Sequence, residues 1–157
     1  MEDALTYNDV LLVPQYSDIR SRTEVSLSSW LSNNEFKVPI IASPMDTISE
    51  SDMAAAMWME GGLAIVHRYN TIKEQRLHCD KASLMGATVG AAIGTSGDYL
   101  DRATALYAAG VRILCVDVAH GHHILMKEAL TELRQAFGDD VHIMAGNIAT
   151  LEGYNDL

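Results

Sequence analysis

At 157 residues the chain fits one ordinary domain, and its contents of 48% hydrophobic and 20% charged residues are close to the average of globular proteins. The formal net charge is −10 and no Lys/Arg-rich run offsets it, which excludes the electrostatic attraction that drives nucleic-acid binding. A start without a signal-peptide pattern, apolar stretches too short to span a bilayer and two cysteines without metal spacing lead us to expect a cytoplasmic protein with no membrane association.

Five short apolar runs follow an N-terminal segment that covers residues 1–38. They are residues 39–43 (PIIAS), 63–67 (LAIVH), 88–94 (TVGAAIG), 113–119 (ILCVDVA) and 142–147 (HIMAGN). The runs are continuous rather than alternating in polarity, which is typical of parallel strands that are covered on both faces. We therefore predict five buried parallel strands.

Helical patterns with recognisable starts lie between these runs. Ser49 to Asp52 and Thr71 to Glu74 resemble capping boxes, in which side chains bind the free N–H groups of a first turn. Asp98 is a candidate cap for the third helix, and Thr150 marks the start of a fifth. The sequence thus predicts a helix after each strand.

Glycines mark the ends of these helices. Gly61, Gly110 and Gly138 each follow a helical pattern and favour a left-handed closing residue. For the fourth helix, residues 123–137, the predicted apolar face consists of Ile124, Leu125, Leu130, Leu133 and Phe137.

The βα repeat of about 25 residues is typical of a (β/α)₈ TIM-type barrel or of a doubly wound parallel sheet. A full barrel needs roughly 250 residues. We therefore expect residues 39–157 to supply about five βα units of a partial α/β barrel domain. An open five-stranded sheet stays as the alternative that the repeat alone allows.

Polar residues and glycines gather where the predicted strands end. The segments are residues 43–47 (SPMDT), 67–70 (HRYN), 94–97 (GTSG), 117–121 (DVAHG) and 146–147 (GN). Ligands bind at the carboxyl ends of strands in both parallel architectures. Asp117 is the strongest candidate, because a carboxylate that ends an apolar run needs a partner or a ligand.

At these segments the chain resembles the IMP dehydrogenase/GMP reductase family. The resemblance rests on five motifs in family order: LTYNDVLLVPQYS (5–17), ASPMDT (42–47), GGLAIVHR (61–68), VDVAHGH (116–122) and AGNIAT (145–150). It implies a TIM-type barrel and an oxidoreductase that acts on a purine nucleotide, GMP or IMP, with NADPH or NAD.

The same resemblance implies roles for individual residues. Ser43 and Met45 would approach the purine nucleotide, and Asn147 would lie near the reacting centre between the nucleotide and the nicotinamide. On the cofactor side, the residues would be Ser21, Arg22, Arg68, Asp117, Val118 and Ala119. A carboxylate at position 117 suits two ribose hydroxyls, and an amide at position 147 can donate and accept at once.

The choice between the two activities leans towards GMP reductase, the NADPH-dependent deamination of GMP to IMP. No room exists between the second and third strands for the pair of regulatory CBS modules that IMP dehydrogenases commonly carry. Ser21 and Arg22 resemble the reductases' Ser-Arg, and an arginine fork suits the extra phosphate of NADPH. Against this, ASPMDT and GGLAIVHR resemble dehydrogenases, so an NAD-dependent IMP dehydrogenase without CBS modules stays as an alternative.

The resemblance also implies a nucleophilic cysteine on a loop after the sixth strand, which forms a covalent intermediate with the purine. Cys79 and Cys115 lie in other contexts, so we assign no catalytic residue and expect negligible turnover from this chain alone. The family's monovalent-cation site, for an ion such as K⁺, would also lie outside it. His120, His122 and His123 lack ligands at a standard spacing, so we predict no metal site there.

Open edges at the first and fifth strands would favour association, with a second copy or with a complementary C-terminal half. Another hypothesis stays open: the chain could be a non-catalytic nucleotide-binding or interaction half-barrel. A different βα-barrel or a Rossmann-like protein is disfavoured, because ASPMDT, and no GxGxxG, follows the first strand. For Arg22 a solvated charge and for His67 a satisfied core histidine are the simpler interpretations.

Overall fold

The computed structural model describes residues 5–31 and 33–157, and its centre is a parallel sheet of five strands. The strands are β3 (Ile41–Ala42), β4 (Leu63–Val66), β5 (Gly90–Ile93), β6 (Ile113–Asp117) and β7 (His142–Gly146). Each pairs in parallel with the next strand along the chain, so the order in the sheet equals the order in the sequence. All five predicted strands are confirmed, although each is shorter than its apolar run.

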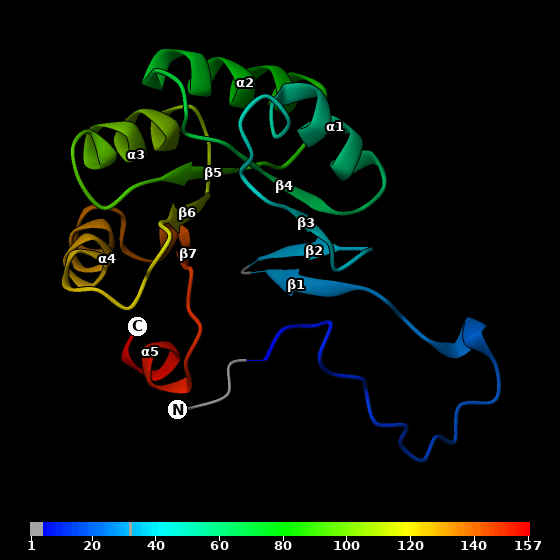
Figure 1. Ribbon diagram of the computed structural model, residues 1–157. Coiled ribbons are helices and arrows are strands. Elements are labelled where there is room, and N and C mark those ends of the chain that lie inside the picture. Colours follow the sequence, from blue (N-terminus) through cyan, green and yellow to red (C-terminus); the bar gives the residue numbers. More distant parts are fainter. Residues whose placement is uncertain (1–4, 32) are drawn as a thin grey trace.

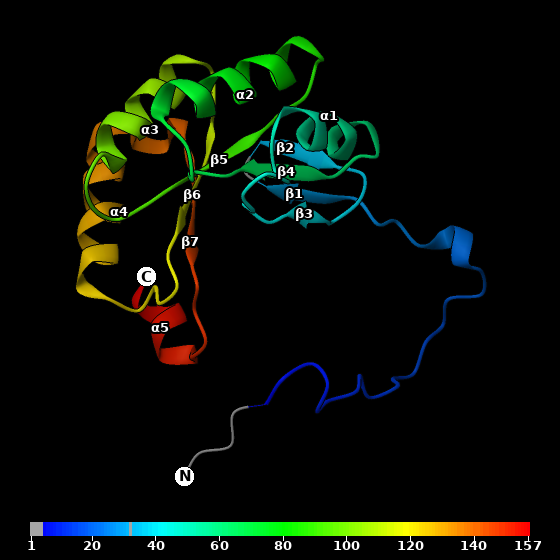
Figure 2. The same cartoon turned by 45° about the horizontal axis from the view of Figure 1, so that its top comes forward.

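A helix follows each strand; the first four helices lie on the outer face of the curled sheet, and the fifth lies beyond the end of β7 (Figures 1 and 2). The helices are α1 (Ser51–Met59), α2 (Ile72–Leu84), α3 (Tyr99–Ala108), α4 (Ile124–Phe137) and α5 (Leu151–Asp156). Sequential parallel order, outer helices and a curled sheet together make a partial (β/α)₈ barrel, which confirms the predicted fold class.

Two apolar clusters cover the two faces of the sheet. The larger lies between sheet and helices and contains Val66, Ile93, Leu106 and Leu114. The smaller lies inside the curl, where Ile65 and Ile113 meet Phe36 of a short antiparallel hairpin. Because both faces are buried, the strands read as continuous apolar runs.

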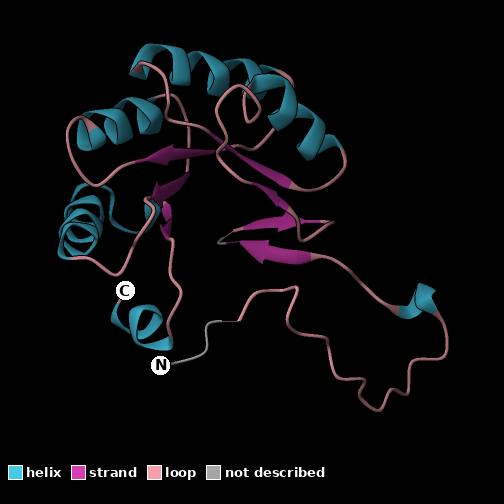
Figure 3. Cartoon of the chain, in the orientation of Figure 1, coloured by secondary structure: helices cyan, strands magenta, loops and turns pink. Residues whose placement is uncertain are grey.

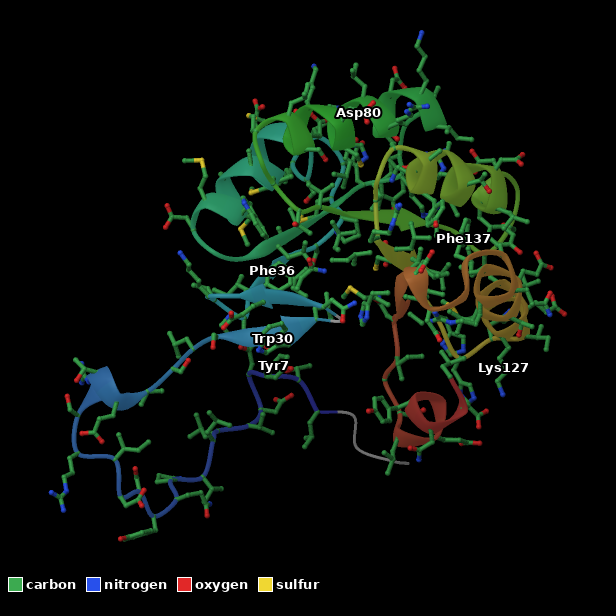
Figure 4. All side chains as sticks on the ribbon, turned by 180° about the vertical axis from the view of Figure 1, so that it is seen from behind. Tyr7, Trp30, Phe36, Asp80, Lys127 and Phe137 are labelled. Atoms are coloured by element: carbon green, nitrogen blue, oxygen red, sulfur yellow. The ribbon has the colours of Figure 1, made fainter. Side chains whose placement is uncertain are left out.

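The hairpin consists of β1 (Ser29–Leu31) and β2 (Asn34–Phe36) and closes one end of the barrel interior (Figure 3). Phe36 is 5% exposed and packs edge-on against Trp58, whereas Trp30 points away and is 65% exposed (Figure 4). The sequence analysis predicted no strands here, since three-residue strands leave almost no periodic pattern.

Of the predicted helix caps, those at α2 and α5 are confirmed, and at α5 the Thr150 hydroxyl accepts a hydrogen bond of 3.0 Å from the Gly153 N–H. Thr71 and Glu74 form a reciprocal capping box. The predicted box at Ser49 is wrong, because the Ser49 hydroxyl donates instead to the carbonyl oxygen of Ser43 and α1 begins after Glu50. Asp98 does precede α3, but its carboxylate binds Arg102 rather than the helix N–H groups, so that capping bond is also wrong.

The predicted helix ends are confirmed, and the predicted apolar face of α4 is confirmed in part. Gly61, Gly110 and Gly138 all have positive φ angles. In α4, Ile124 and Leu125 are exposed. The buried stripe instead contains Met126, Ala129 and Leu133, with Leu130 and Phe137 packed beside it. This stripe follows the i, i+3, i+7 spacing of a helix, and the two first-turn residues lie off it.

The chain before the hairpin is an extended arm, residues 5–28, with one 3-10 turn (Arg22–Glu24). It lies apart from the sheet in Figures 1 and 2, and Tyr7, Leu11, Leu12 and Tyr16 on it are more than 90% exposed. None of the helices among the described residues has the length and apolarity that a membrane crossing requires.

Candidate functional site

A cavity of about 420 Å³ opens at the carboxyl ends of β3, β6 and β7. Its polar lining comes from Ser43, Asp117 and Asn147, three residues that the sequence analysis singled out on separate motifs. Its apolar floor consists of Ile41, Pro44, Ile65, Cys115 and Met144. A hydroxyl, a carboxylate and an amide that converge over an apolar floor form the kind of pocket that binds small polar ligands.

Backbone hydrogen bonds fix Asp117 and Asn147 beside each other. Asp117 pairs with Gly146 in the register of β6 and β7. Beyond the strands, the Val118 N–H donates to the Gly146 carbonyl at 2.9 Å, and the Asn147 N–H donates to the Val118 carbonyl at 2.8 Å. The pairing of the two strands therefore continues up to the rim of the cavity.

Gly121 closes this corner from the next loop. Its N–H donates to the Asn147 carbonyl at 2.7 Å. A Cβ at this position would lie only 2.9 Å from that same oxygen, so the approach requires glycine. The glycine of the VDVAHGH motif thus holds Asn147 in place.

The Asp117 carboxylate is half-buried, and no described residue donates a hydrogen bond to it. Its own backbone carbonyl accepts a bond of 3.2 Å from Arg68 Nη2, so a cation from the end of β4 reaches across to the end of β6. The Arg68 side chain passes Gly94, which directly follows β5, and its Nε atom is buried without a hydrogen-bond partner among the described residues. Arg68 thus binds the backbone of Asp117, while the Asp117 carboxylate accepts no hydrogen bond from the described residues.

The β3–α1 loop carries the other predicted nucleotide contacts. Ser43 lines the cavity, whereas Met45 is 52% exposed at the surface of the loop. The loop folds on itself, because the Ser49 N–H donates to the Met45 carbonyl at 2.9 Å and the Ser49 hydroxyl binds the Ser43 carbonyl. Ser49 therefore has a structural role inside the loop that presents Ser43.

The other predicted cofactor residues are spread more widely. Val118 packs against the outer cluster, and Ala119 is exposed just after it. Ser21 and Arg22 lie on the N-terminal arm, where the Ser21 hydroxyl accepts a bond from the Thr23 N–H. The structure does not bring these two arm residues to the cavity, so their cofactor role stays a prediction.

Neither cysteine has the character of a nucleophile. Burial, with a smaller contribution from the nearby Asp80 carboxylate, raises the pKa of the Cys79 thiol to about 12. Burial raises the pKa of Cys115 to about 11, with a smaller contribution from Asp117. Cys115 does line the cavity, but a thiol that stays protonated at neutral pH is a poor nucleophile.

Two of the three histidines after β6 make hydrogen bonds at the start of α4. His123 Nδ1 accepts a bond from the Leu125 N–H and caps α4. His122 Nε2 lies 3.0 Å from an Asp156 carboxylate oxygen that Lys127 also binds, which ties α5 to α4. Within residues 5–31 and 33–157, no group of three or more potential ligands is arranged to hold a metal ion.

One cluster at the same end of the sheet was missed by the sequence analysis. His67 is 2% exposed, and its Nε2 atom lies 3.3 Å from Glu50 Oε1 and 3.9 Å from Asp46 Oδ1. His78 of α2 approaches the same Glu50 oxygen at 3.8 Å. The sequence marked His67 and Arg68 as strand-end residues, but it did not predict that Asp46 and Glu50 would lie next to His67.

A larger groove of about 680 Å³ lies on the outer side of β7, between α4 and α5. Its lining is mostly apolar and includes Leu130, Ile143, Ile148, Tyr154 and Leu157. We place the site in the smaller cavity, because the polar strand-end residues converge there. The groove instead marks the edge of the sheet that no further strand covers.

The amino-acid sequence is similar to a known protein family and to three named enzymes. A sequence model of the IMP dehydrogenase / GMP reductase domain matches residues 4–157. The inosine-5'-monophosphate dehydrogenase of Nitrosopumilus maritimus (strain SCM1) is 25% identical over 281 residues, covering 99% of this chain and 59% of its own length. The inosine-5'-monophosphate dehydrogenase of Cryptosporidium parvum is 32% identical over 197 residues. The match covers 98% of this chain and 48% of the dehydrogenase.

The GMP reductase of Leishmania donovani is 50% identical over 76 residues, which are 48% of this chain and 15% of the reductase. Both kinds of enzyme are thus among the relatives. The chain spans about half the length of the two dehydrogenases that it matches over nearly all its residues.

Proposed function

Because the chain belongs to the IMP dehydrogenase/GMP reductase family, we propose that it carries the cofactor side and part of the nucleotide side of a purine-nucleotide oxidoreductase. The observation that supports this most is the cavity in which Ser43, Asp117 and Asn147 meet. They come from three different βα units, and no hydrogen bond within residues 5–31 and 33–157 joins their side chains to one another.

The residues present fit a nicotinamide cofactor. The Asp117 carboxylate, free of bonds from the described residues, can accept the two hydroxyls of a ribose. Arg68, whose Nη2 donates to the Asp117 backbone carbonyl, adds a positive charge at this edge of the sheet. A volume of about 420 Å³ suits a nucleoside-sized group. When bound, the nicotinamide ring supplies hydride chemistry, and this chain would orient it against the nucleotide.

On the nucleotide side, Ser43 would donate or accept through its hydroxyl, and Met45 would cover an apolar part of the ligand. Asn147, between the two sides, can donate and accept at once and so can hold groups of both ligands. The purine nucleotide and the nicotinamide would meet above Cys115 and Met144.

We favour GMP as the nucleotide and NADPH as the cofactor. Only α2 and its short loops lie between β4 and β5, which leaves no room for a CBS pair at that point. The alignment to the Nitrosopumilus dehydrogenase extends over 281 residues, so that relative has a long segment without counterpart here. The Leishmania GMP reductase gives a higher identity over its shorter match, 50%. Arg22 would suit the additional phosphate of NADPH once the arm reaches the cofactor.

NAD-dependent oxidation of IMP is the second candidate, because the two relatives matched over nearly the whole chain are IMP dehydrogenases. Either reaction needs a nucleophilic cysteine, and the raised pKa values of Cys79 and Cys115 disfavour both. We therefore propose that turnover requires a second part that brings the cysteine and covers the open edge of β7. A monovalent-cation site, as in the family, would belong to that part.

An assay of the chain with and without such a part tests this proposal. We expect no NADPH oxidation with GMP and no NAD reduction with IMP by the purified chain alone. After addition of the C-terminal half of a GMP reductase, GMP with NADPH should be converted and IMP with NAD should not.

The outcomes separate the candidates. Conversion of IMP with NAD by the reconstituted protein would identify a dehydrogenase instead. Turnover by the chain alone would contradict the proposal that a second part must supply the nucleophilic cysteine. Nucleotide binding without turnover under every condition would favour the non-catalytic half-barrel.

A further inference from the structure

His67 occupies a place that packing alone does not explain. It directly follows β4, and its ring is 2% exposed at the end of the sheet where the cavity opens. Its Nδ1 atom accepts a hydrogen bond of 3.2 Å from the Tyr69 N–H. An accepting Nδ1 places the proton of the neutral ring on Nε2, so Nε2 is a donor.

That donor points at the β3–α1 loop. Glu50 Oε1 lies 3.3 Å from His67 Nε2, and Asp46 Oδ1 lies 3.9 Å from it. The backbone adds a second link, because the His67 N–H donates to the Ser49 carbonyl at 3.1 Å. His67 thus makes hydrogen bonds to Ser49 and Glu50 of the loop and lies near a third loop residue, Asp46.

The loop needs such external support. Thr47 has a φ angle of 59°, in the left-handed region that a β-branched residue rarely adopts. A backbone of this kind persists only where its surroundings hold it in place. The loop presents Ser43 and Met45, so a change of its backbone would move both side chains.

Two further titratable groups face this cluster, His78 of α2 and Tyr69. The Nε2 atom of His78 lies 3.8 Å from Glu50 Oε1, and its ring centroid lies 6.4 Å from that of His67. Tyr69 stacks on His67 from the other side at 6.2 Å. The ring of His67 is therefore held between α2 and its own loop, with Nε2 directed at Glu50.

We infer that His67 is a positioning residue: its Nε2–H holds Glu50 and thereby fixes the loop that carries Ser43 and Met45. This role rests on the proposed nucleotide binding by that loop. His67 itself does not line the cavity, so it would act on the nucleotide only through the loop.

Two substitutions separate the two ends of the ring. His67→Asn puts an acceptor where Nδ1 stands and removes the donor to Glu50. His67→Gln puts a donor where Nε2 stands and removes the acceptor for Tyr69. If the Nε2–H donor holds the loop, the GMP dissociation constant should rise by about tenfold in His67→Asn, because the hydrogen bond to the Glu50 carboxylate is lost. In His67→Gln this bond is kept, so the dissociation constant should stay within about twofold of the wild-type value.

The measurement is a ¹H–¹⁵N NMR titration of the full chain with GMP, with His142→Asn, at the opposite end of the sheet, as the control. Spectra without nucleotide give an independent result, in which the amide signals of residues 43–50 should shift in His67→Asn and stay near the wild-type positions in His67→Gln. Urea unfolding shows whether each variant is folded.

Equal behaviour of the two variants, in affinity and in the loop signals, would overturn the positioning role. A ring with its proton on Nδ1, read from its ¹⁵N shifts, would do the same. Failure of the wild-type chain to bind GMP would contradict the proposed function instead, and the nucleotide-free spectra would still decide the role of His67.

Discussion

Replacement of Gln75 by leucine should lower the free energy of unfolding by about 4 kcal/mol, because three buried hydrogen bonds lose one partner each. Gln75 is fully buried on α2. Its Nε2 donates to the carbonyls of Val66 and Ala92 at 3.2 and 2.7 Å, and its Oε1 accepts from Arg102 Nη1 at 2.9 Å. A leucine of similar volume would leave two carbonyls and one guanidinium N–H unpaired inside the protein.

Arg102 extends the same network to α3 and is 6% exposed. It donates to the Asn70 carbonyl at 3.0 Å and binds the Asp98 carboxylate at 2.8 Å, although Asp98 is itself half exposed. The side chains of Gln75 and Arg102 therefore join β4, β5, α2 and α3. Loss of this network should weaken the packing of α2 and α3 against β4 and β5.

Urea unfolding of Gln75→Leu, followed by circular dichroism, is the test. The matched control is Arg76→Ala on the same helix, which removes a surface ion pair with Asp80 of 3.5 Å and should cost no more than about 0.5 kcal/mol. A Gln75→Leu protein within 1 kcal/mol of the wild type would show that water or rearrangement satisfies the freed groups.

Replacement of Asp117 by alanine should weaken NADPH binding by about 100-fold, because two hydrogen bonds from ribose hydroxyls to a carboxylate are lost. The stability of the chain should hardly change, since no described residue donates to this carboxylate. This separation of affinity from stability is what distinguishes a ligand-binding residue from a structural one.

Titration of cofactor fluorescence measures the affinity, and urea unfolding measures the stability. Asp101→Asn on α3 is the control, because this exposed carboxylate lies away from the cavity and its loss should leave both quantities unchanged. Unchanged NADPH affinity in Asp117→Ala would remove Asp117 from the cofactor site. A large loss of stability would assign it a structural task.

The sequence predicted the fold well because its signal is local and repeated. Strands buried on both faces appear as continuous apolar runs, and the glycines after α1, α3 and α4 need positive φ angles that few other residues adopt. Parallel strands share one carboxyl end, so Ser43, Asp117 and Asn147 could be expected together although more than a hundred residues separate the first from the last.

The errors arose where a side chain has a choice of partner. Ser49 and Asp98 both stand at helix starts, but each finds a stronger partner, the Ser43 carbonyl and the Arg102 guanidinium. The contact between His67 and Glu50 bridges 17 positions in the sequence and depends on distances that no local pattern encodes. Propensity describes what a residue can do alone, and tertiary contacts decide between the options.

The most direct test of the account is a map of where ligands bind on the purified chain. In ¹H–¹⁵N NMR spectra, GMP should shift the amides of Ser43 and Met45, NADPH should shift those of Asp117 and Val118, and both should shift Asn147. The groove beside α4 and α5 should stay unaffected. Ligand-induced shifts confined to that groove, or no shift with either ligand, would contradict the claim that this half-barrel carries the cofactor and nucleotide site.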